Sequence, residues 1–330
     1  MTTSLWATCK RIAFVVNSIP FEYKLYKEGM FNYLVLIVLV FSNVACINAN
    51  SQSTKKEINL DYISETVENY KVDNYKTVSI KSSKNLIEVL KENGLWKFAT
   101  NEIKPIVVSN FPKDFKKLIV KDKKRAFFHS MIPMILVASE EIKYERSRFI
   151  EISKKHKNIK DFKSENVSKM ELSNKLFILQ VTKKYKTTKK YELLKRIDTL
   201  PISLVLSQTA IESAWGTSRF SVQGNNLFGV WSFNGKGLIP KFRKKGLKHR
   251  VAVYPSLLDS VRDYMLKINT VRAYKKLRYL RTKSKNSIYL TKGLLHYSER
   301  KEAYIKDLQK MIKRNRLIKF DSLHLKSNKI

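Results

Sequence analysis

The strongest candidate for acid–base chemistry in this sequence is a glutamate near the end of an apolar segment. Glu212 closes the run 204–211, which is predicted to be helical, and Trp215 follows three residues later. The negative end of the helix dipole and burial against Trp215 would both raise the pKa of this carboxyl group. A glutamate with a raised pKa can hold a proton near neutral pH and donate it to a glycosidic oxygen. An exposed glutamate in a last helical turn is the alternative interpretation.

A turn-rich stretch with two adjacent amides follows at 224–229 and reads Gly-Asn-Asn-Leu-Phe-Gly. The side chains of Asn225 and Asn226 could orient sugar hydroxyl and N-acetyl groups. Aromatic rings offer flat faces that stack on pyranose rings, and such rings occur here at Phe228, Trp231 and Phe233. Taken alone, the same residues could form a hairpin turn with aromatic core residues.

Together these segments resemble the glucosaminidase superfamily, glycoside hydrolase family 73, and within it the Bax-type subgroup. The central motifs are 206–218 and 224–229, and the resemblance covers about 116–320. Further similar segments occur in the same order downstream: Tyr254–Ser256, Asp259–Val261, Ala273–Tyr274, Tyr297–Arg300 and Ala303–Ile305.

The resemblance implies a mainly α fold with a lysozyme-like catalytic domain and a small β-hairpin lobe, preceded by a helical hairpin. It implies an endo-β-N-acetylglucosaminidase that cleaves peptidoglycan after N-acetylglucosamine. Glu212 resembles the catalytic acid, and Tyr297 resembles an active-site tyrosine near the anomeric carbon. The residues that we expect to contact substrate are Gln208, Trp215, Asn225, Asn226, Phe228 and Trp231.

A second carboxylate is proposed for some members of the family, but this sequence has no Asp or Glu between Glu212 and Asp259. Either Asp259 approaches the site as a further catalytic group, or the substrate's own N-acetyl group attacks instead. Asp259 could equally cap the helix that is predicted to begin there.

Two other functions stay open on the sequence. A lytic transglycosylase also uses one glutamate in a lysozyme-like fold, and a catalytically inactive wall-binding protein would need no second carboxylate. Superfamily members often carry an amidase label, which we do not expect to apply literally.

The composition is strongly basic, with 65 Lys and Arg against 28 Asp and Glu and a formal net charge of +37. This charge favours anionic partners such as wall polymers or membrane surfaces, although it could also reflect a general lysine bias. No RNP, zinc-finger or basic-zipper pattern supports nucleic-acid binding. We expect a monomer without a cofactor. We also expect no metal site, since no cluster of His, Asp and Glu has metal-ligand spacing.

The N-terminal part contains an apolar segment at 31–49, preceded by Lys24 and Lys27. It resembles a secretory signal, and its length of about 19 residues would also just span a bilayer as a helix. The basic flank predicts that everything after residue 50 is exported to the periplasm or cell envelope. Both cysteines, Cys9 and Cys46, precede the predicted folded region.

The periodicity of the remaining chain predicts how the site is held. Helical patterns cover 116–142, about 170–197, a helix with Ser203 as N-cap and Gly216 at its end, and then 256–269, 271–281 and 299–313. Loops and a short β-hairpin are expected between Gly224 and Tyr254. The predicted divisions are a cytoplasmic segment (1–29), a signal or anchor (30–50), a polar linker with some local structure (51–115), a helical hairpin (116–200), the catalytic domain (201–320) and a tail (321–330).

Overall fold

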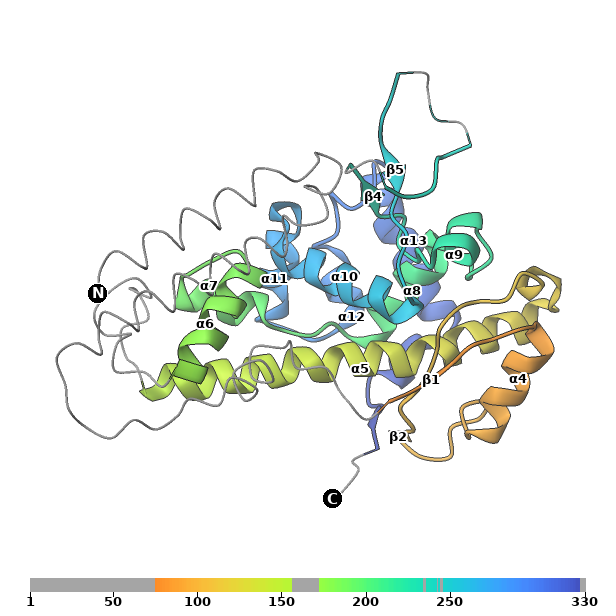
Figure 1. The fold of residues 1–330 in the computed structure, drawn as a ribbon, viewed down its shortest axis with the longest axis horizontal. Helices are drawn as coiled ribbons and strands as arrows, with labels where there is room; N and C mark the ends of the chain where they lie inside the picture. Colours follow the sequence, from red (N-terminus) through yellow and green to blue (C-terminus); the bar gives the residue numbers. More distant parts are fainter. Residues whose placement is uncertain (1–74, 156–171, 234–235, 242, 244–245, 327–330) are drawn as a thin grey trace, which may run out of the picture. The chain divides into compact units, whose positions relative to one another are not determined.

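Helices dominate the computed structural model, which describes residues 75–155, 172–233, 236–241, 243 and 246–326. All of these residues belong to one compact unit. The helices are α4 (Ser83–Glu92), α5 (Val120–Lys155), α6 (Leu172–Lys184), α7 (Lys190–Arg196), α8 (Ile202–Glu212), α9 (Arg219–Gly224), α10 (Leu257–Thr270), α11 (Lys275–Arg281), α12 (Ser287–Thr291) and α13 (Lys301–Arg314) (Figure 1). Short 3₁₀ turns cover Phe115–Lys117, Arg272–Tyr274 and Leu317–Phe320.

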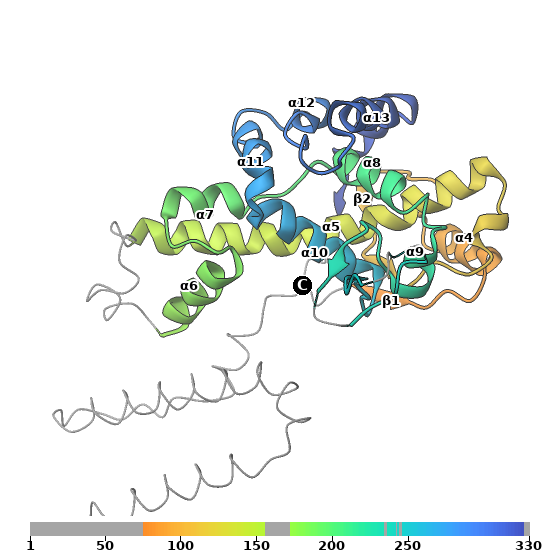
Figure 2. The same ribbon diagram turned by 90° about the horizontal axis from the view of Figure 1, so that it is seen from above.

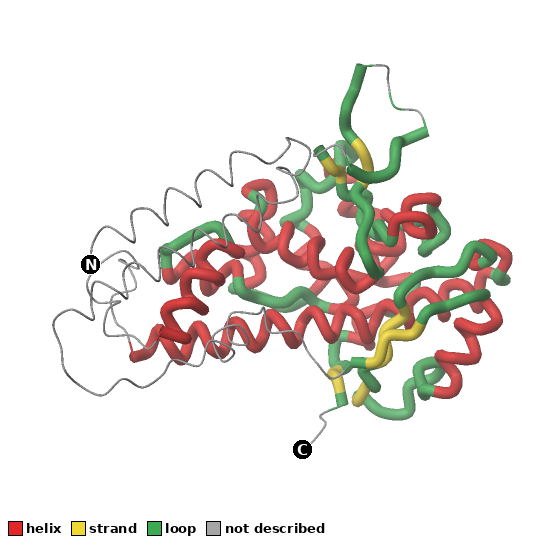
Figure 3. Tube along the Cα trace, viewed as in Figure 1, coloured by secondary structure: helices red, strands yellow, loops and turns green. Residues whose placement is uncertain are grey.

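The strands are short and pair two by two (Figure 3). They are β1 (Lys76–Val78), β2 (Glu102–Ile103), β3 (Ile106–Val108), β4 (Trp231–Ser232), β5 (Arg250–Val251) and β6 (His324–Leu325). Two pairs are parallel, β1 with β3 and β2 with β6, whereas β4 and β5 are antiparallel. The predicted mainly α fold with a small β-hairpin lobe is confirmed, and it is consistent with the lysozyme-like fold that the resemblance implies.

The long helix α5 is the central element of the core, and α8 and α10 pack against it (Figure 2). Every residue from Met131 to Ser139 is buried. This part of the helix is therefore surrounded by protein, which explains why its sequence is apolar without the length of a membrane span. Each large apolar side chain buried here contributes about 1.5–3 kcal/mol by the hydrophobic effect.

Two carboxylates of α5 fix neighbouring helices by charged hydrogen bonds. Glu141 accepts two bonds from Arg262 of α10, with Nε–Oε2 and Nη2–Oε1 distances of 2.9 and 2.5 Å. Glu145 accepts from the Tyr185 hydroxyl at 2.7 Å and from Lys184 at 2.6 Å. Bidentate arginine–carboxylate pairs add directional precision to charge attraction, so α10 is held in register along α5.

Helix α8, which carries Glu212, is buried along almost its whole length, from Ile202 to Ala210. The expected N-cap role of Ser203 is wrong, because Ser203 lies inside the first turn and Pro201 precedes the helix. The Asp321 carboxylate instead accepts from the backbone N–H and the hydroxyl of Ser203, both at 2.7 Å. A carboxylate at a helix N-terminus satisfies free N–H groups and complements the helix dipole.

Other elements differ from the expected boundaries in informative ways. The stretch 75–118, which overlaps the predicted linker, contributes three strands, α4 and buried residues such as Leu86, Leu90 and Phe115. Strands β1 and β3 pair with each other, whereas β2 pairs with β6 near the end of the described chain. The predicted helix at 170–197 is divided into α6 and α7, and α12 was not expected. The helices predicted at 256–269 and 299–313 correspond to α10 and α13. The helix predicted at 271–281 corresponds to the 3₁₀ turn Arg272–Tyr274 followed by α11.

No helix in the described part of the chain is long and apolar enough to cross a membrane. The predicted signal or anchor at 31–49 lies outside the described residues.

Candidate active site

Glu212 is the last residue of α8 and is half-buried, at the negative end of the helix dipole. The chain leaves this helix through three successive left-handed residues, Ala214, Trp215 and Gly216, with φ of 49, 61 and 75°. A Cβ atom on Gly216 would lie only 2.8 Å from Cδ2 of Phe111, so only glycine fits there. Left-handed conformations cost non-glycine residues about 1–3 kcal/mol and are found preferentially at functional sites.

A chain of hydrogen bonds holds the Glu212 carboxyl group. The Tyr304 hydroxyl of α13 donates to Glu212 Oε1 at 2.7 Å and accepts from Gln208 Nε2 at 3.1 Å. Gln208 Oε1 in turn accepts from the Tyr264 hydroxyl of α10 at 2.5 Å. Three helices therefore contribute to the position of one carboxyl oxygen. The other oxygen, Oε2, has no hydrogen-bond partner among the described residues and can carry a transferable proton.

The aromatic rings around this network stack on one another. Tyr297 lies parallel to Tyr304, with ring centroids 5.5 Å apart and an interplanar angle of 4°. Phe228 lies parallel to Tyr264 at 3.9 Å and 8°, and Tyr274 packs on Tyr297 at 5.8 Å. The Tyr297 hydroxyl donates to the Phe228 carbonyl at 3.4 Å. Tyr297 is thus brought to the same cluster as Glu212, as expected from the resemblance.

Burial controls the electrostatics of the cluster. It raises the pKa of the Glu212 carboxyl group above its ordinary value, and the hydrogen bond from Tyr304 opposes part of that rise. Burial also raises the pKa of Tyr264, Tyr274, Tyr297 and Tyr304, and the negative charge of Glu212 contributes to each shift. The four phenols therefore stay neutral, and Tyr304 remains a hydrogen-bond donor at physiological pH.

The two asparagines of the 224–229 loop make structural contacts. Asn226 is 1% exposed; its Nδ2 donates to the carbonyls of Val230 and Ala252, and its Oδ1 accepts from two backbone N–H groups. Asn225 is left-handed at the end of α9, and its Nδ2 donates to the carbonyls of Tyr254 and Pro255. Their amides hold the loop beneath the hairpin lobe, as in Asx-type turns.

Asp259 lies in the first turn of α10 and bonds within that region. Its Oδ2 accepts from the Ser256 hydroxyl at 2.8 Å, and its Oδ1 accepts from Arg262 at 3.0 Å. Ser256 in turn caps the helix by accepting from the Asp259 N–H. No contact in the described part of the chain joins Asp259 to Glu212 or to the tyrosine cluster.

Of the remaining residues that were expected to contact substrate, three pack against other protein side chains and one is exposed in the hairpin lobe. Trp215 packs edge-on against Phe127 and Phe128 of α5, at 5.8 and 5.1 Å, with the Lys124 ammonium 4.9 Å from its ring. Phe228 is buried in the cluster, and Gln208 is fully buried in the network. Trp231 in the lobe differs from these residues because 49% of its surface is exposed.

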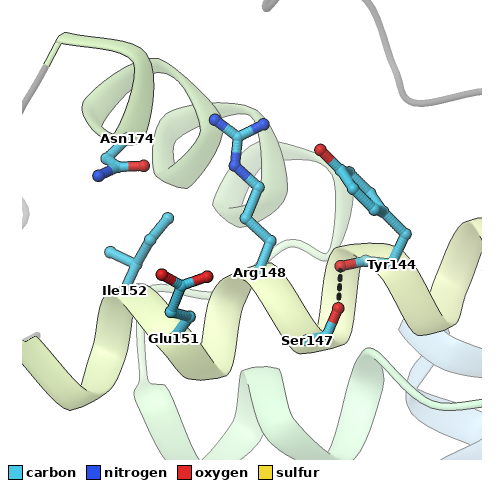
Figure 4. A pocket seen from close by; sticks show the side chains of 6 residues that line it. All are labelled: Tyr144, Ser147, Arg148, Glu151, Ile152 and Asn174. Carbon is cyan, nitrogen blue, oxygen red and sulfur yellow. Dashed lines mark hydrogen bonds between the residues drawn. The ribbon is translucent and has the colours of Figure 1, made fainter.

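A separate recess between α5 and α6 contains none of the expected site residues (Figure 4). It has a volume of about 320 Å³ and is lined by Tyr144, Ser147, Arg148, Glu151, Ile152 and Asn174. The Ser147 hydroxyl donates to the Tyr144 carbonyl at 3.0 Å, and the Arg148 guanidinium lies 4.5 Å from the Phe177 ring. The first contact lies within α5, whereas the second joins α5 to α6.

Tyr304, Tyr264 and Tyr274 complete the site but were not among the expected site residues. A signal for Tyr304 exists in the sequence, since it lies seven residues after Tyr297 in a segment that resembles the family. No local pattern indicates Tyr264, because its partner Gln208 lies 56 residues earlier in the chain.

Comparison with known proteins supports the resemblance. Residues 187–317 match the model of the Glucosaminidase family, described as mannosyl-glycoprotein endo-beta-N-acetylglucosaminidase. Protein bax of Escherichia coli (strain K12) is 29% identical over 164 residues, which are 47% of this chain and 54% of bax, so the chain spans about half the length of this curated relative. The catalytic domain of the autolysin Auto from Listeria monocytogenes is 25% identical over 44% of this chain and 81% of that structure, with a TM-score of 0.32. Residues 187–317 of this chain are therefore similar to the Glucosaminidase family, and the predicted Bax-type resemblance is confirmed.

Proposed function

We propose that this protein hydrolyses the β-1,4 bond after N-acetylglucosamine in peptidoglycan glycan strands, with Glu212 as the general acid. The observation that carries the proposal is the half-buried Glu212 carboxyl group, whose pKa is raised by burial and whose Oε1 is held by Tyr304. A raised pKa extends the pH range in which the acid keeps a proton that it can donate to a glycosidic oxygen. The match of residues 187–317 to the Glucosaminidase family model supports the class of bond.

Proton transfer from Oε2 to the leaving oxygen would start the reaction. The C–O bond then breaks, and positive charge develops on the anomeric carbon and ring oxygen. The carboxylate left on Glu212 is stabilised by the Tyr304 hydrogen bond, which is stronger to a charged acceptor than to a neutral one. Tyr297, stacked on Tyr304, is proposed to lie near the anomeric carbon.

The attack on the anomeric carbon is proposed to need no carboxylate from the hairpin lobe. No Asp or Glu occurs at 213–258, and Asp259 is occupied by Ser256 and Arg262. The N-acetyl oxygen of the substrate can attack the anomeric carbon and form a five-membered ring, as in the known substrate-assisted glycosidases. Water then adds to the anomeric carbon and opens this ring, while the Glu212 carboxylate takes the proton from the water and becomes the acid again. Asp259 is accordingly proposed as a helix-capping residue.

The setting of this activity is the cell envelope. Peptidoglycan lies outside the cytoplasmic membrane, where the apolar segment 31–49 is expected to direct the chain. The net charge of +37 would favour retention on anionic wall or membrane polymers. We further propose that the protein acts as a monomer without cofactor.

Mass spectrometry of purified sacculi digested by the full-length protein tests the proposal. Fragments with reducing N-acetylglucosamine ends are expected from wild type, and none above background from Glu212→Gln. Anhydromuramic ends would instead indicate a lytic transglycosylase. Equal, negligible digestion by both proteins would indicate a non-catalytic wall-binding protein.

A further inference from the structure

The hairpin lobe, which contains β4 and β5, and helix α9 border a second recess. This recess is separate from the tyrosine cluster of Tyr264, Tyr274, Tyr297 and Tyr304. We call it the lobe recess; it has a volume of about 540 Å³ and combines apolar and cationic side chains. Its lining includes Phe220, Trp231 and Leu247 together with Arg219, Arg243 and His249. This volume lies within the range of roughly 300–1,000 Å³ typical of ligand sites.

The aromatic side of the recess is suited to a sugar ring. Trp231 meets His249 edge-on at a centroid distance of 4.5 Å, with an interplanar angle of 86°. About half of the Trp231 surface remains exposed. An exposed indole offers a large apolar face at a low conformational-entropy cost, since tryptophan has only two side-chain torsions.

Two arginines of the recess, Arg219 and Arg243, form no ion pair with a carboxylate of the described residues. Arg219 Nη2 donates to the Ile239 carbonyl at 2.5 Å, and its guanidinium lies 4.9 Å from the Phe220 ring. Arg243 Nη1 donates to the His249 carbonyl at 3.2 Å. These neutral acceptors orient the two guanidinium groups without neutralising them. No Asp or Glu occurs anywhere at 213–258 to do so.

We propose that the lobe recess binds a carboxylate-bearing sugar of the glycan strand, with Trp231 against the ring and Arg219 and Arg243 toward the carboxylate. Guanidinium groups prefer carboxylates because their N–H donors match both oxygens. In peptidoglycan, alternate sugars carry a lactyl group that ends in a carboxylate or a peptide, and the peptide carries further carboxylates. The identity of the glycan rests on the proposed function.

Binding to sacculi tests this recess separately from catalysis. The full-length protein with Glu212→Gln, purified in detergent, is pelleted with sacculi and with the same sacculi after carbodiimide amidation of their carboxyl groups. Adding Arg219→Gln and Arg243→Gln should weaken binding to untreated sacculi about fivefold, because exposed charge contacts each contribute modestly. The two proteins should bind amidated sacculi equally.

Two matched variants separate charge from folding. The pair Arg219→Lys and Arg243→Lys keeps both charges but lacks the guanidinium fork, so it should recover part of the binding, which it would not do if the lobe had collapsed. The pair Lys84→Gln and Lys91→Gln removes the same charge from exposed positions on α4 and should change binding less than twofold.

The proposal is overturned if the glutamine pair binds untreated sacculi like its parent, or if it loses affinity equally on amidated sacculi. Absence of hydrolysis by wild type would refute the proposed function alone. The contrast between untreated and amidated sacculi would still report on the recess.

Discussion

Replacing Tyr304 with phenylalanine removes one hydroxyl group from the network around Glu212 and keeps the stacked ring. The lost bond is the 2.7 Å contact to Oε1, which favours the ionised carboxylate. A hydrogen bond to a charged group contributes about 1.5–3 kcal/mol. The same hydrogen bond also stabilises the protonated acid, although less strongly. We therefore expect it to favour the ionised over the protonated form of Glu212 by about 1.4 kcal/mol, which corresponds to about one pKa unit.

The sign follows from the role of the acid. The reaction needs protonated Glu212, so its rate falls as pH rises through the pKa of that group. Because Tyr304→Phe raises the pKa further, the descending limb of kcat/KM against pH should move to higher pH by about one unit. The assay is release of reducing ends from soluble glycan strands between about pH 4 and 9.

Tyr274→Phe is the matched control for this measurement. Burial and the charge of Glu212 raise the pKa of Tyr274, yet its hydroxyl makes no hydrogen bond to Glu212 among the described residues. The descending limb should therefore stay in place in this variant. A limb that stays in place in Tyr304→Phe, or moves to lower pH, would refute the inference that Tyr304 stabilises the ionised acid.

Three further substitutions test the supports of the site. Asn226→Ala leaves buried backbone groups of the lobe without partners and should lower the free energy of unfolding by about 2–4 kcal/mol in urea titrations, whereas a loss below about 0.5 kcal/mol would contradict its structural role. Gly216→Ala forces a side chain against Phe111 at positive φ and should cost about 1–3 kcal/mol; an unchanged melting temperature would show that the turn can relax. Asp259→Asn should leave kcat within about threefold of wild type, since Asp259 bonds Ser256 and Arg262; a hundredfold loss would make it a catalytic group.

The sequence predicts the position of Glu212 at a helix end from local features, whereas the rise of its pKa has a long-range cause. An apolar run, the helix end and a nearby tryptophan are adjacent in the chain. The physical cause differs in one respect, since the ring contacts of Trp215 are with Phe127 and Phe128 of α5. Burial of the carboxyl group arises from the packing of three helices.

The roles of the 224–229 loop could not be read from residue types. Asparagine binds sugars well, but it also adopts left-handed conformations and satisfies backbone groups in turns, and Asn225 and Asn226 do the latter. An aromatic residue such as Phe228 serves a sugar site or a core equally well. Only the stacked Tyr264 ring, from a helix further along the chain, shows that Phe228 is buried.

Contacts between residues that lie far apart in the chain have no local signal in the sequence. Ser203 has the residue type of an N-cap, but the carboxylate that binds its N–H comes from Asp321, 118 residues later. Likewise, the polar composition of the region before α5 gives little indication of strands β1 and β3. Their pairing joins residues 30 positions apart, for instance Thr77 with Val107.

Titration of the Glu212 carboxyl group itself tests the central claim most directly. Glutamates labelled with ¹³C at Cδ can be followed by NMR, and the Glu212 signal is the one missing from Glu212→Gln. Its midpoint should lie above the ordinary value of 4.5 and coincide with the descending limb of kcat/KM. A midpoint at or below 4.5, or a limb at a different pH, would contradict catalysis by a buried, protonated Glu212.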